Sequence, residues 1–147
     1  MDYRELAKEF MEMMHQMHRS KGQKKINDSM QGESFVLFYI SEHEGNVIPS
    51  DISNAMEISS ARIAATLNSL EKKGFIERKI DVEDRRRILI ELTEEGKKEA
   101  NRHQEMVMRI TINMLEYLGE QDAKEFVRIM KKLSKHRQKE FNPEEFK

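Results

Sequence analysis

The 147-residue chain contains no cysteine, and this absence excludes several kinds of chemistry at once. Without thiols the protein has no disulfide bond, no thiolate zinc site and no thiol-based redox sensor, which fits a reducing cytosol. Only 2 prolines and 6 glycines are present. Long coil segments are therefore not expected, and helices should dominate the fold.

The sequence also lacks a long apolar run and a strong net charge. No apolar run approaches the roughly 20 residues that span a bilayer. The N-terminal sequence MDYRELAKEF mixes acids and bases, unlike a signal peptide. We expect a soluble, cytoplasmic protein with no membrane contact. The formal net charge is −1, so an interaction with nucleic acid has to be argued from where the charges lie.

Helical periodicity marks the first part of the chain. Apolar residues recur at three- and four-residue steps through residues 3–18, which predicts an amphipathic helix. The polar segment 20–32 holds two glycines and is interpreted as a connection. Ser34 is the expected N-cap of a second helix over 35–43, whose apolar run FVLFYI indicates a buried position.

Two short helices in the middle of the chain have the pattern of a helix-turn-helix. Pro49 fits the first position of a short helix that has one apolar side. After a tight turn, Ser59 or Ser60 caps a second helix that runs to about Lys73. Gly74 then supplies a natural C-terminal capping residue. Two helices joined in this way are typical of DNA-binding proteins.

The period then changes from helical to alternating. Segments 75–80 and 87–92 are predicted as strands, and the charged loop DVEDRR separates them. A hairpin directly after a helix-turn-helix makes the motif a winged helix.

Two further helices follow the hairpin. Thr93 is expected to cap a long helix that runs to about Leu118. Gly119 breaks it, and a last helix begins near Asp122, before a tail over 136–147 that is interpreted as frayed or partly disordered. The predicted fold class is mainly α with a small β-hairpin wing: a winged helix-turn-helix between N- and C-terminal helical arms.

One face of the helix over about 59–73 is small and polar. Ile63, Leu67 and Leu70 share the side that must face the core. The opposite side is flanked by Lys72 and consists of Ala61, Arg62, Ala65, Asn68 and Ser69. Small residues allow close approach to a major groove, and arginine, asparagine and serine can reach base edges or phosphates. An ordinary solvent-exposed face would suit the same residues.

The expected hairpin loop carries three consecutive cations, Arg85, Arg86 and Arg87. Guanidinium groups suit a narrow minor groove or bidentate contact with phosphate. A solvated run of paired charges is the alternative, and Asp84 and Arg86 are well placed to brace one another. Three arginines exceed what bracing requires, so we expect this loop to contact DNA.

These residues also carry a family signature. Residues 35–96 resemble the MarR family of winged helix-turn-helix transcriptional regulators, in the stretches SDISNAMEISSARIAATLNSL and LEKKGFIERKIDVEDRRRILIELTEEG. Within the second stretch, Asp84, Arg86, Leu92 and Thr93 fill the spacing D-x-R-x5-L-T. The helical arms match in order and length, so the resemblance covers nearly the whole chain.

The resemblance implies a homodimer that binds palindromic or pseudo-palindromic double-stranded DNA and regulates transcription. We expect a repressor that a small aromatic or phenolic effector releases. The family organisation divides the chain into an N-terminal dimerisation arm with its connection (1–33), a winged helix-turn-helix domain (34–96) and C-terminal dimerisation helices (97–147). The residues expected at the dimer interface are Leu6, Phe10, Met13, Met17, Ile110, Met114, Phe126, Met130 and Leu133.

The resemblance also assigns single positions to DNA contact, with the recognition helix in the major groove and a wing over about 78–90 in the minor groove. These positions are Ser60, Ala61, Arg62, Ala65, Arg78, Arg85 and Arg86. Of the wing arginines, Arg86 is favoured for the minor groove and Arg85 is the alternative, while Arg78 is expected near the DNA backbone. Family members often have Thr-Arg where this chain has Ala64 and Ala65, so base reading should depend more on Arg62.

The chain has 11 methionines, many of them in the first helix and between residues 106 and 114. Flexible thioethers fill irregular packing between helices, so we interpret them as part of the dimer interface. A ligand-adaptable pocket is the alternative interpretation.

Other function classes have little support in the sequence. His15, His18, His43 and His103 show no H-E-x-x-H spacing, and neither a phosphate-binding glycine loop nor a nucleophile elbow is present. We expect no enzymatic activity, no cofactor and no metal. The alternatives are a metal-responsive regulator and a winged-helix module that binds protein without binding DNA.

Overall fold

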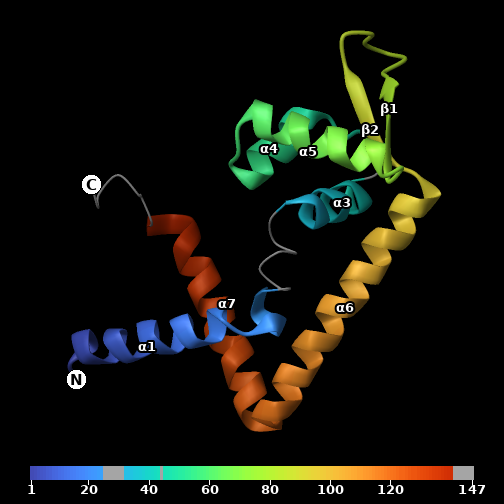
Figure 1. Cartoon of the computed structure of the whole chain (residues 1–147). Helices are drawn as coiled ribbons and strands as arrows, with labels where there is room; N and C mark the ends of the chain where they lie inside the picture. The colour runs from blue at the N-terminus through green and yellow to red at the C-terminus, as the bar shows by residue number, and fades with distance from the viewer. Residues whose placement is uncertain (25–31, 44, 141–147) are drawn as a thin grey trace. The chain divides into compact units, whose positions relative to one another are not determined.

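The computed structural model describes residues 1–24, 32–43 and 45–140 (Figure 1). The chain divides into two compact units, residues 1–107 and 108–147. No helix among the described residues is long and apolar enough to cross a membrane. The elements are α1 (Tyr3–His18), α3 (Glu33–Glu42), α4 (Pro49–Met56), α5 (Ser60–Lys72), β1 (Ile76–Ile80), β2 (Ile88–Leu92), α6 (Glu94–Leu118) and α7 (Glu120–Glu140).

The predicted fold class is confirmed: helices dominate the described residues, and an antiparallel hairpin follows the second helix of a helix-turn-helix. The first helix occupies residues 3–18, as predicted. The segment interpreted as a connection, 20–32, contains a helical turn at residues 21–24. The rest of that segment up to residue 31 lies outside the described residues.

Helix α3 begins two residues earlier than predicted. Its N-cap is Gly32, with φ of 76° and no side-chain capping bond, and Glu33 is its first residue. The prediction that Ser34 caps this helix is therefore wrong. Glycine adopts positive φ without a steric penalty, and a carboxylate in the first turn complements the helix dipole. Both features favour a start before Ser34.

Helix α7 also begins earlier and continues further than predicted. It starts at Glu120, directly after Gly119 at φ 79°, instead of near Asp122. A single glycine in the left-handed region is enough to end one helix and begin the next. The frayed tail predicted from residue 136 is wrong as far as Glu140, where the helix ends. Residues 141–147 lie outside the described part of the chain.

Local hydrogen bonds fix the helix-turn-helix. The Asp51 carboxylate accepts from the Ile48 backbone nitrogen at 3.1 Å, at the start of α4. Glu57 ends this helix in the left-handed region, with φ of 54°. Of the two serines considered as the cap of α5, Ser59 fills the role, and its hydroxyl accepts from the Arg62 nitrogen at 3.2 Å. The turn and the cap together fix the direction in which α5 leaves the turn.

The end of α5 forms the turn that the sequence predicted at Gly74. The Gly74 nitrogen donates to the Glu71 carbonyl, and the Phe75 nitrogen donates to the Leu70 carbonyl, each at 3.0 Å. This pair of bonds is a Schellman motif, and it places glycine where φ is positive, at 76°. The chain therefore leaves α5 and enters β1 through one sharply defined turn.

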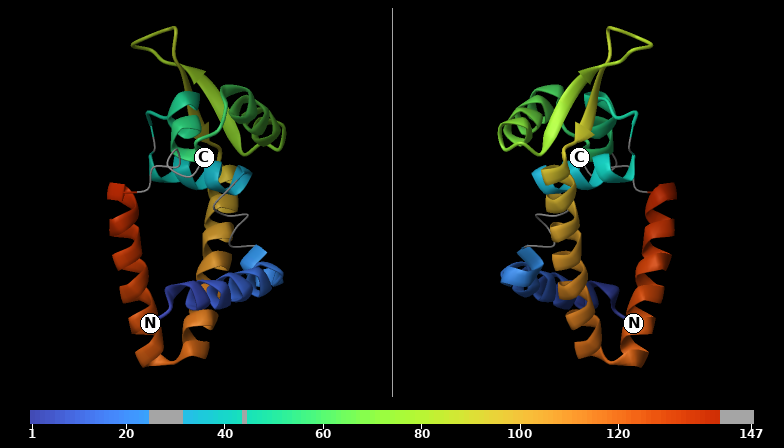
Figure 2. Two further views of the ribbon diagram at one scale, coloured as in Figure 1. Left: turned by 90° about the vertical axis from the view of Figure 1, so that its left-hand side faces the viewer. Right: turned by 90° about the vertical axis from the view of Figure 1, so that its right-hand side faces the viewer.

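The hairpin is attached to the rest of the winged helix by its inner end. Its register pairs Ile76 with Leu92 and Ile80 with Ile88. The Ile90 nitrogen also donates to the Val47 carbonyl at 2.8 Å, which ties β2 to the segment before α4. Because only the inner half of the hairpin is tied, its loop extends beyond the body as a wing (Figure 2).

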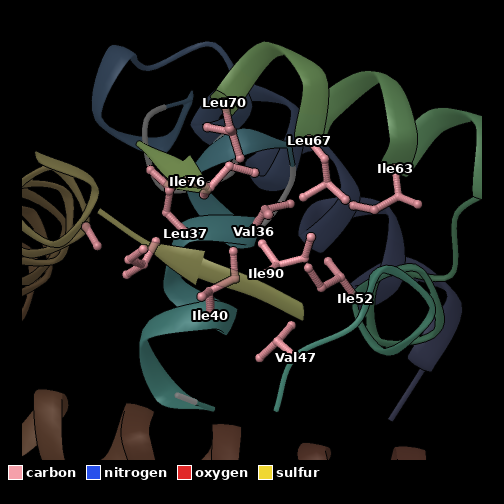
Figure 3. Packing of buried hydrophobic residues seen from close by; sticks show 12 residues of the cluster. Val36, Leu37, Ile40, Val47, Ile52, Ile63, Leu67, Leu70, Ile76 and Ile90 are labelled. Atoms are coloured by element: carbon pink, nitrogen blue, oxygen red, sulfur yellow. The ribbon is translucent and has the colours of Figure 1, made fainter. Parts of the chain in front are cut away.

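Among the described residues, the buried apolar core is formed by the winged helix and the start of α6. Figure 3 shows side chains from α5 pointing toward α3 and β2, and helical periodicity places them on one face of α5. The buried apolar residues are Val36, Leu37, Ile40, Val47, Ile52, Ile63, Leu67, Leu70, Ile76, Ile90, Leu92 and Ala100. This core holds the outer face of α5 and the base of the wing in fixed positions.

The start of α6 lies against the junction between α5 and β1. Thr93 Oγ1 accepts from the Gly96 nitrogen at 3.0 Å, so Thr93 caps α6 as predicted, and it also donates to the Gly74 carbonyl at 2.5 Å. The Thr93 nitrogen donates to the Phe75 carbonyl at 3.0 Å. A Cβ atom added to Gly96 would lie 1.9 Å from that same carbonyl oxygen. Residue 96 therefore has to be glycine in this packing.

Candidate DNA-binding interface

The outer face of α5 is exposed and has little side-chain bulk. The sequence-predicted contact residues Ser60, Ala61, Arg62, Ala65 and Asn68 are all exposed. Arg62 forms no hydrogen bond or ion pair through its side chain with any residue that the structure describes. This face therefore combines room for close approach with one guanidinium group that is available to a partner.

Ser69 lies at the edge of this face and has a partner inside the protein. Its hydroxyl donates to Glu33 Oε1 at 2.5 Å, and the Lys73 ammonium donates to Glu33 Oε2 at 2.5 Å. Ser69 is half-buried. This differs from the prediction that Ser69 reads DNA, because its hydroxyl is used to join α5 to the first residue of α3.

The Glu33 carboxylate is titratable within this contact. Partial burial raises its pKa, but the hydrogen bonds from Lys73 and Ser69 lower it, and the net pKa lies below the ordinary 4.5. A carboxylate with a lowered pKa stabilises the folded state above its unfolded pKa and loses this contribution as the pH falls through the folded value. The contact is thus a pH-dependent support for the orientation of α5.

Replacing Glu33 with glutamine is expected to lower the free energy of unfolding at neutral pH by about 0.5–1 kcal/mol, because the pair is partly exposed. The difference from wild type should shrink as the pH falls below 4.5 and through the lower pKa of the folded state, where Glu33 becomes protonated. Urea denaturation from pH 7 to pH 3 measures it. Glu42→Gln, at the exposed end of the same helix, is the matched control, and an equal loss in both variants would contradict the assignment.

A second contact joins the base of the wing to α5. The Arg78 guanidinium donates to Asn68 Oδ1 at 2.7 Å and lies 3.5 Å from the Glu71 carboxylate. The sequence placed Arg78 and Asn68 separately at the DNA surface, and the structure brings them together. The guanidinium of Arg78 thus connects β1 to the outer edge of α5 and lies between the two expected DNA-contacting elements.

The wing loop holds its three arginines in different ways. Arg86 is 91% exposed and pairs with Asp84, its Nε lying 3.1 Å from Oδ1. The hydrogen bonds from the Arg86 side chain and backbone lower the pKa of Asp84. Arg87 lies 3.7 Å from Asp81, whereas Arg85 has no ion pair with a described residue. The loop thus presents one cation without a described ion pair and two that pair with aspartates of the same loop.

Asp81 was not singled out from the sequence, although it organises this loop. Its Oδ1 accepts from the Glu83 nitrogen at 2.9 Å, and its side chain is nearly buried. The Asp81 nitrogen donates to the Arg87 carbonyl at 3.0 Å, which closes the loop at its base. An aspartate that accepts from the backbone two residues later is an Asx turn. The D-x-x-D spacing of Asp81 and Asp84 was the signal that could have indicated this role.

The residues predicted for the dimer interface are not buried within their own units. In α1, Leu6, Phe10, Met13 and Met17 are exposed, and α1 has no buried residue. In the unit over residues 108–147, Ile110 and Met114 are half-buried. The remaining three, which are exposed, are Phe126, Met130 and Leu133.

The histidines do not form a metal centre in the described residues. No group of three or more histidine, aspartate or glutamate side chains there is placed to hold a metal ion. His15 Nδ1 lies 2.7 Å from the Met11 carbonyl and His43 Nδ1 lies 2.9 Å from the Tyr39 carbonyl, so both rings bond to their own helices.

Comparison with known proteins assigns this arrangement to a family. Residues 34–111, more than half of the chain, match the model of the winged helix DNA-binding domain. The chain belongs to the winged-helix DNA-binding family. The matched residues include α5, the wing and the first part of α6, which are the elements that form and support the exposed face described above.

HTH-type transcriptional regulators of Bacillus subtilis (strain 168) are similar in sequence. The HTH-type transcriptional regulator YwhA is 34% identical over 100 residues, which cover 68% of this chain and 71% of YwhA. The HTH-type transcriptional repressor YetL is 36% identical over 62 residues, 42% of this chain and 36% of YetL. The chain is therefore a winged-helix regulator of transcription.

Solved structures share the fold over almost the whole chain. Staphylococcus aureus MepR in complex with DNA has a TM-score of 0.62 at 23% identity, covering 88% of this chain and 96% of MepR. MarR has a TM-score of 0.65 at 23% identity, covering 88% of each chain. The fold expected from the MarR resemblance is therefore confirmed.

Proposed function

We propose that the chain is a homodimeric repressor that binds palindromic or pseudo-palindromic double-stranded DNA. The observation that carries this proposal is the presence of two surfaces in one compact unit, the small polar face of α5 and the arginine-bearing loop of the wing. Helix α5 would lie in the major groove with Ser60, Ala61, Arg62 and Ala65 nearest the bases.

The major-groove role follows from size and charge. Ala61 and Ala65 leave space for the helix to approach the base edges, and Arg62 is the long donor on this face without a described partner. Arginine binds guanine O6 and N7 in a bidentate manner, which is the commonest specific contact in the major groove. We therefore assign base reading chiefly to Arg62.

The wing would reach the adjacent minor groove. Arg85 and Arg86 project from its loop, and a narrow minor groove has an enhanced negative potential that attracts arginine. Asp84 holds Arg86 by two side-chain bonds. A guanidinium held in this way loses little conformational freedom on binding. Arg85 and Arg86 are proposed as minor-groove contacts, and Arg78 and Arg87 are proposed to lie closer to phosphates.

Dimerisation would cover the apolar arms. Phe10 and Met13 in α1 and Leu133 in α7 are more than two-fifths exposed, and water-exposed apolar surface of this extent is typical of an interaction site. A second copy of the chain is the proposed partner, since two recognition helices about 34 Å apart match two half-sites of a palindrome. In sedimentation equilibrium we expect twice the 17.5 kDa mass of one chain. A monomer at micromolar concentration would contradict this.

Release by a small aromatic or phenolic ligand is the proposed regulation. A ligand that altered the spacing of the two recognition helices would cost much of the specific binding, because both half-sites have to be engaged together. YetL, whose name describes a repressor, supports the direction of regulation. Titrating a panel of small phenols into the protein–DNA complex tests this, and retention of DNA at saturating phenol concentrations would count against it.

The test of DNA binding begins with selection of a duplex from a random library by the purified full chain. Affinity for the selected duplex is then measured between about 50 and 200 mM salt, where a protein with 6–10 phosphate contacts loses roughly 10³–10⁵ in affinity. We expect an inverted repeat in the selected sequence and a steep fall in affinity with salt. Absence of binding at low salt, or affinity that does not depend on salt, would overturn the regulator assignment.

A further inference from the structure

The wing carries apolar side chains that the core does not use. Val82 is 96% exposed, Ile80 67% and Ile88 46%. Ile80 and Ile88 face each other across the two strands, next to the loop that contains Val82. We call these three residues the wing patch.

The wing patch continues the inner face of the hairpin beyond the core. Side chains alternate along a strand, so Ile80 lies on the same face as Ile76 and Arg78, and Ile88 on the same face as Ile90. Ile76 and Ile90 are buried against the helices. No described residue covers Ile80, Val82 or Ile88 to the same degree, so folding of this chain does not account for them.

The contacts of Arg78 establish which way the patch faces. Arg78 projects from the same face of the hairpin and reaches Asn68 on α5. Ile80 and Ile88 therefore lie on the side of the wing that faces the recognition helix, further out along the same strands, and Val82 follows in the adjoining loop. This is the side on which a DNA backbone would pass between α5 in the major groove and the wing in the minor groove.

The surroundings of the patch match the chemistry of a groove wall. Arg85, Arg86 and Arg87 follow Val82 in the same loop and bring positive charge to a polyanion. The walls of the minor groove are deoxyribose rings, whose C–H surface is apolar. An aliphatic edge flanked by guanidinium groups fits such a wall.

We propose that the wing patch packs against the deoxyribose rings of the minor groove and supplies a part of the DNA affinity that does not depend on salt. This inference rests on the proposed function, since it needs the wing to enter the groove. Burial of apolar surface releases no counterions, whereas each neutralised phosphate does. The two contributions can therefore be separated by the salt dependence of binding.

The experiment compares Ile80→Thr/Ile88→Thr and Val82→Ser with wild type on the selected duplex at several salt concentrations. Threonine keeps the β-branched side chain that suits a strand, so the hairpin should persist. We expect the double variant to bind about tenfold more weakly at every salt concentration, with an unchanged slope of log K against log salt. Arg85→Ala should instead reduce the slope by about 1 per subunit.

Two matched controls share the wing with the patch. Leu89→Thr removes an aliphatic side chain from the opposite face of the hairpin and should leave affinity within about twofold. Glu83→Gln removes a carboxylate from the same loop. It should change the slope of log K against log salt and leave the salt-independent part of the affinity unchanged. Circular dichroism and urea denaturation verify that each variant folds.

The outcomes separate this inference from the function on which it depends. If wild type fails to bind any duplex at low salt, the proposed function is wrong. If wild type binds and the double variant binds equally well, the patch makes no contact with DNA and the inference is wrong. A loss of affinity that appears together with a lower salt slope, or with a change in oligomeric state in sedimentation, also overturns it.

Discussion

Replacing Gly96 with alanine is expected to destabilise the winged helix by about 3 kcal/mol or more. An added Cβ would lie 1.9 Å from the Phe75 carbonyl oxygen and 2.8 Å from its carbon. Both atoms belong to the backbone and cannot rotate away. The same oxygen accepts from the Thr93 nitrogen, so moving it also weakens a hydrogen bond.

Helix propensity predicts the opposite sign, which makes this a decisive test. In an exposed helix interior, glycine to alanine stabilises by about 1 kcal/mol. Urea denaturation of Gly96→Ala measures the sign and size of the change. Glu95→Ala, one residue earlier and exposed, is the control and should stay within about 0.5 kcal/mol of wild type. A stabilised Gly96→Ala variant would show that α6 does not pack against Phe75 as described.

Removing both wing arginines is the change expected to affect DNA binding most. Arg85→Ala/Arg86→Ala should lower affinity for the selected duplex about a hundredfold or more near 0.15 M salt, and reduce the slope of log K against log salt by about 2 per subunit. Neither side chain contributes to the core. The free energy of unfolding should therefore remain close to that of wild type.

A charge-matched control separates contact from net charge. Lys98→Ala/Arg102→Ala removes two cations from α6, where they pair with Glu95 and Glu99. This variant has the same net charge as the wing variant and should bind DNA within a few-fold of wild type. Fluorescence anisotropy across salt concentrations measures both. Equal losses in the two variants would show that overall charge, instead of the wing, governs binding.

The sequence predicted the parts of this fold that depend on local chemistry. Proline at the start of α4, serine before α5 and Gly74 after it each mark a helix boundary, because their backbone preferences act within a few residues. The alternation of apolar residues predicted both strands with the correct last residue, and each strand begins one residue later than predicted. Boundaries failed at Ser34 and Asp122, where a neighbouring glycine at positive φ decided the start of the helix.

Contacts between residues far apart in the chain could not be predicted from the sequence. Glu33 and Ser69 are 36 residues apart, and no periodicity relates α3 to α5. Arg78 was placed near DNA by position, but its bonds to Asn68 and Glu71 depend on how the hairpin returns over α5. The candidate DNA-contacting residues themselves could be proposed because they are the polar residues opposite a predictable apolar stripe.

The fixed junction at Phe75 has a consequence for how the protein can move. Phe75 stands between the end of the recognition helix and the first residue of the wing, and Thr93 and Gly96 hold its carbonyl without clearance. Helix α5 and the wing, the two proposed DNA-contacting elements, thus share this junction with the first turn of α6. A torque applied along that helix would turn both elements through the same angle, so the major-groove and minor-groove contacts would be gained or lost as one unit.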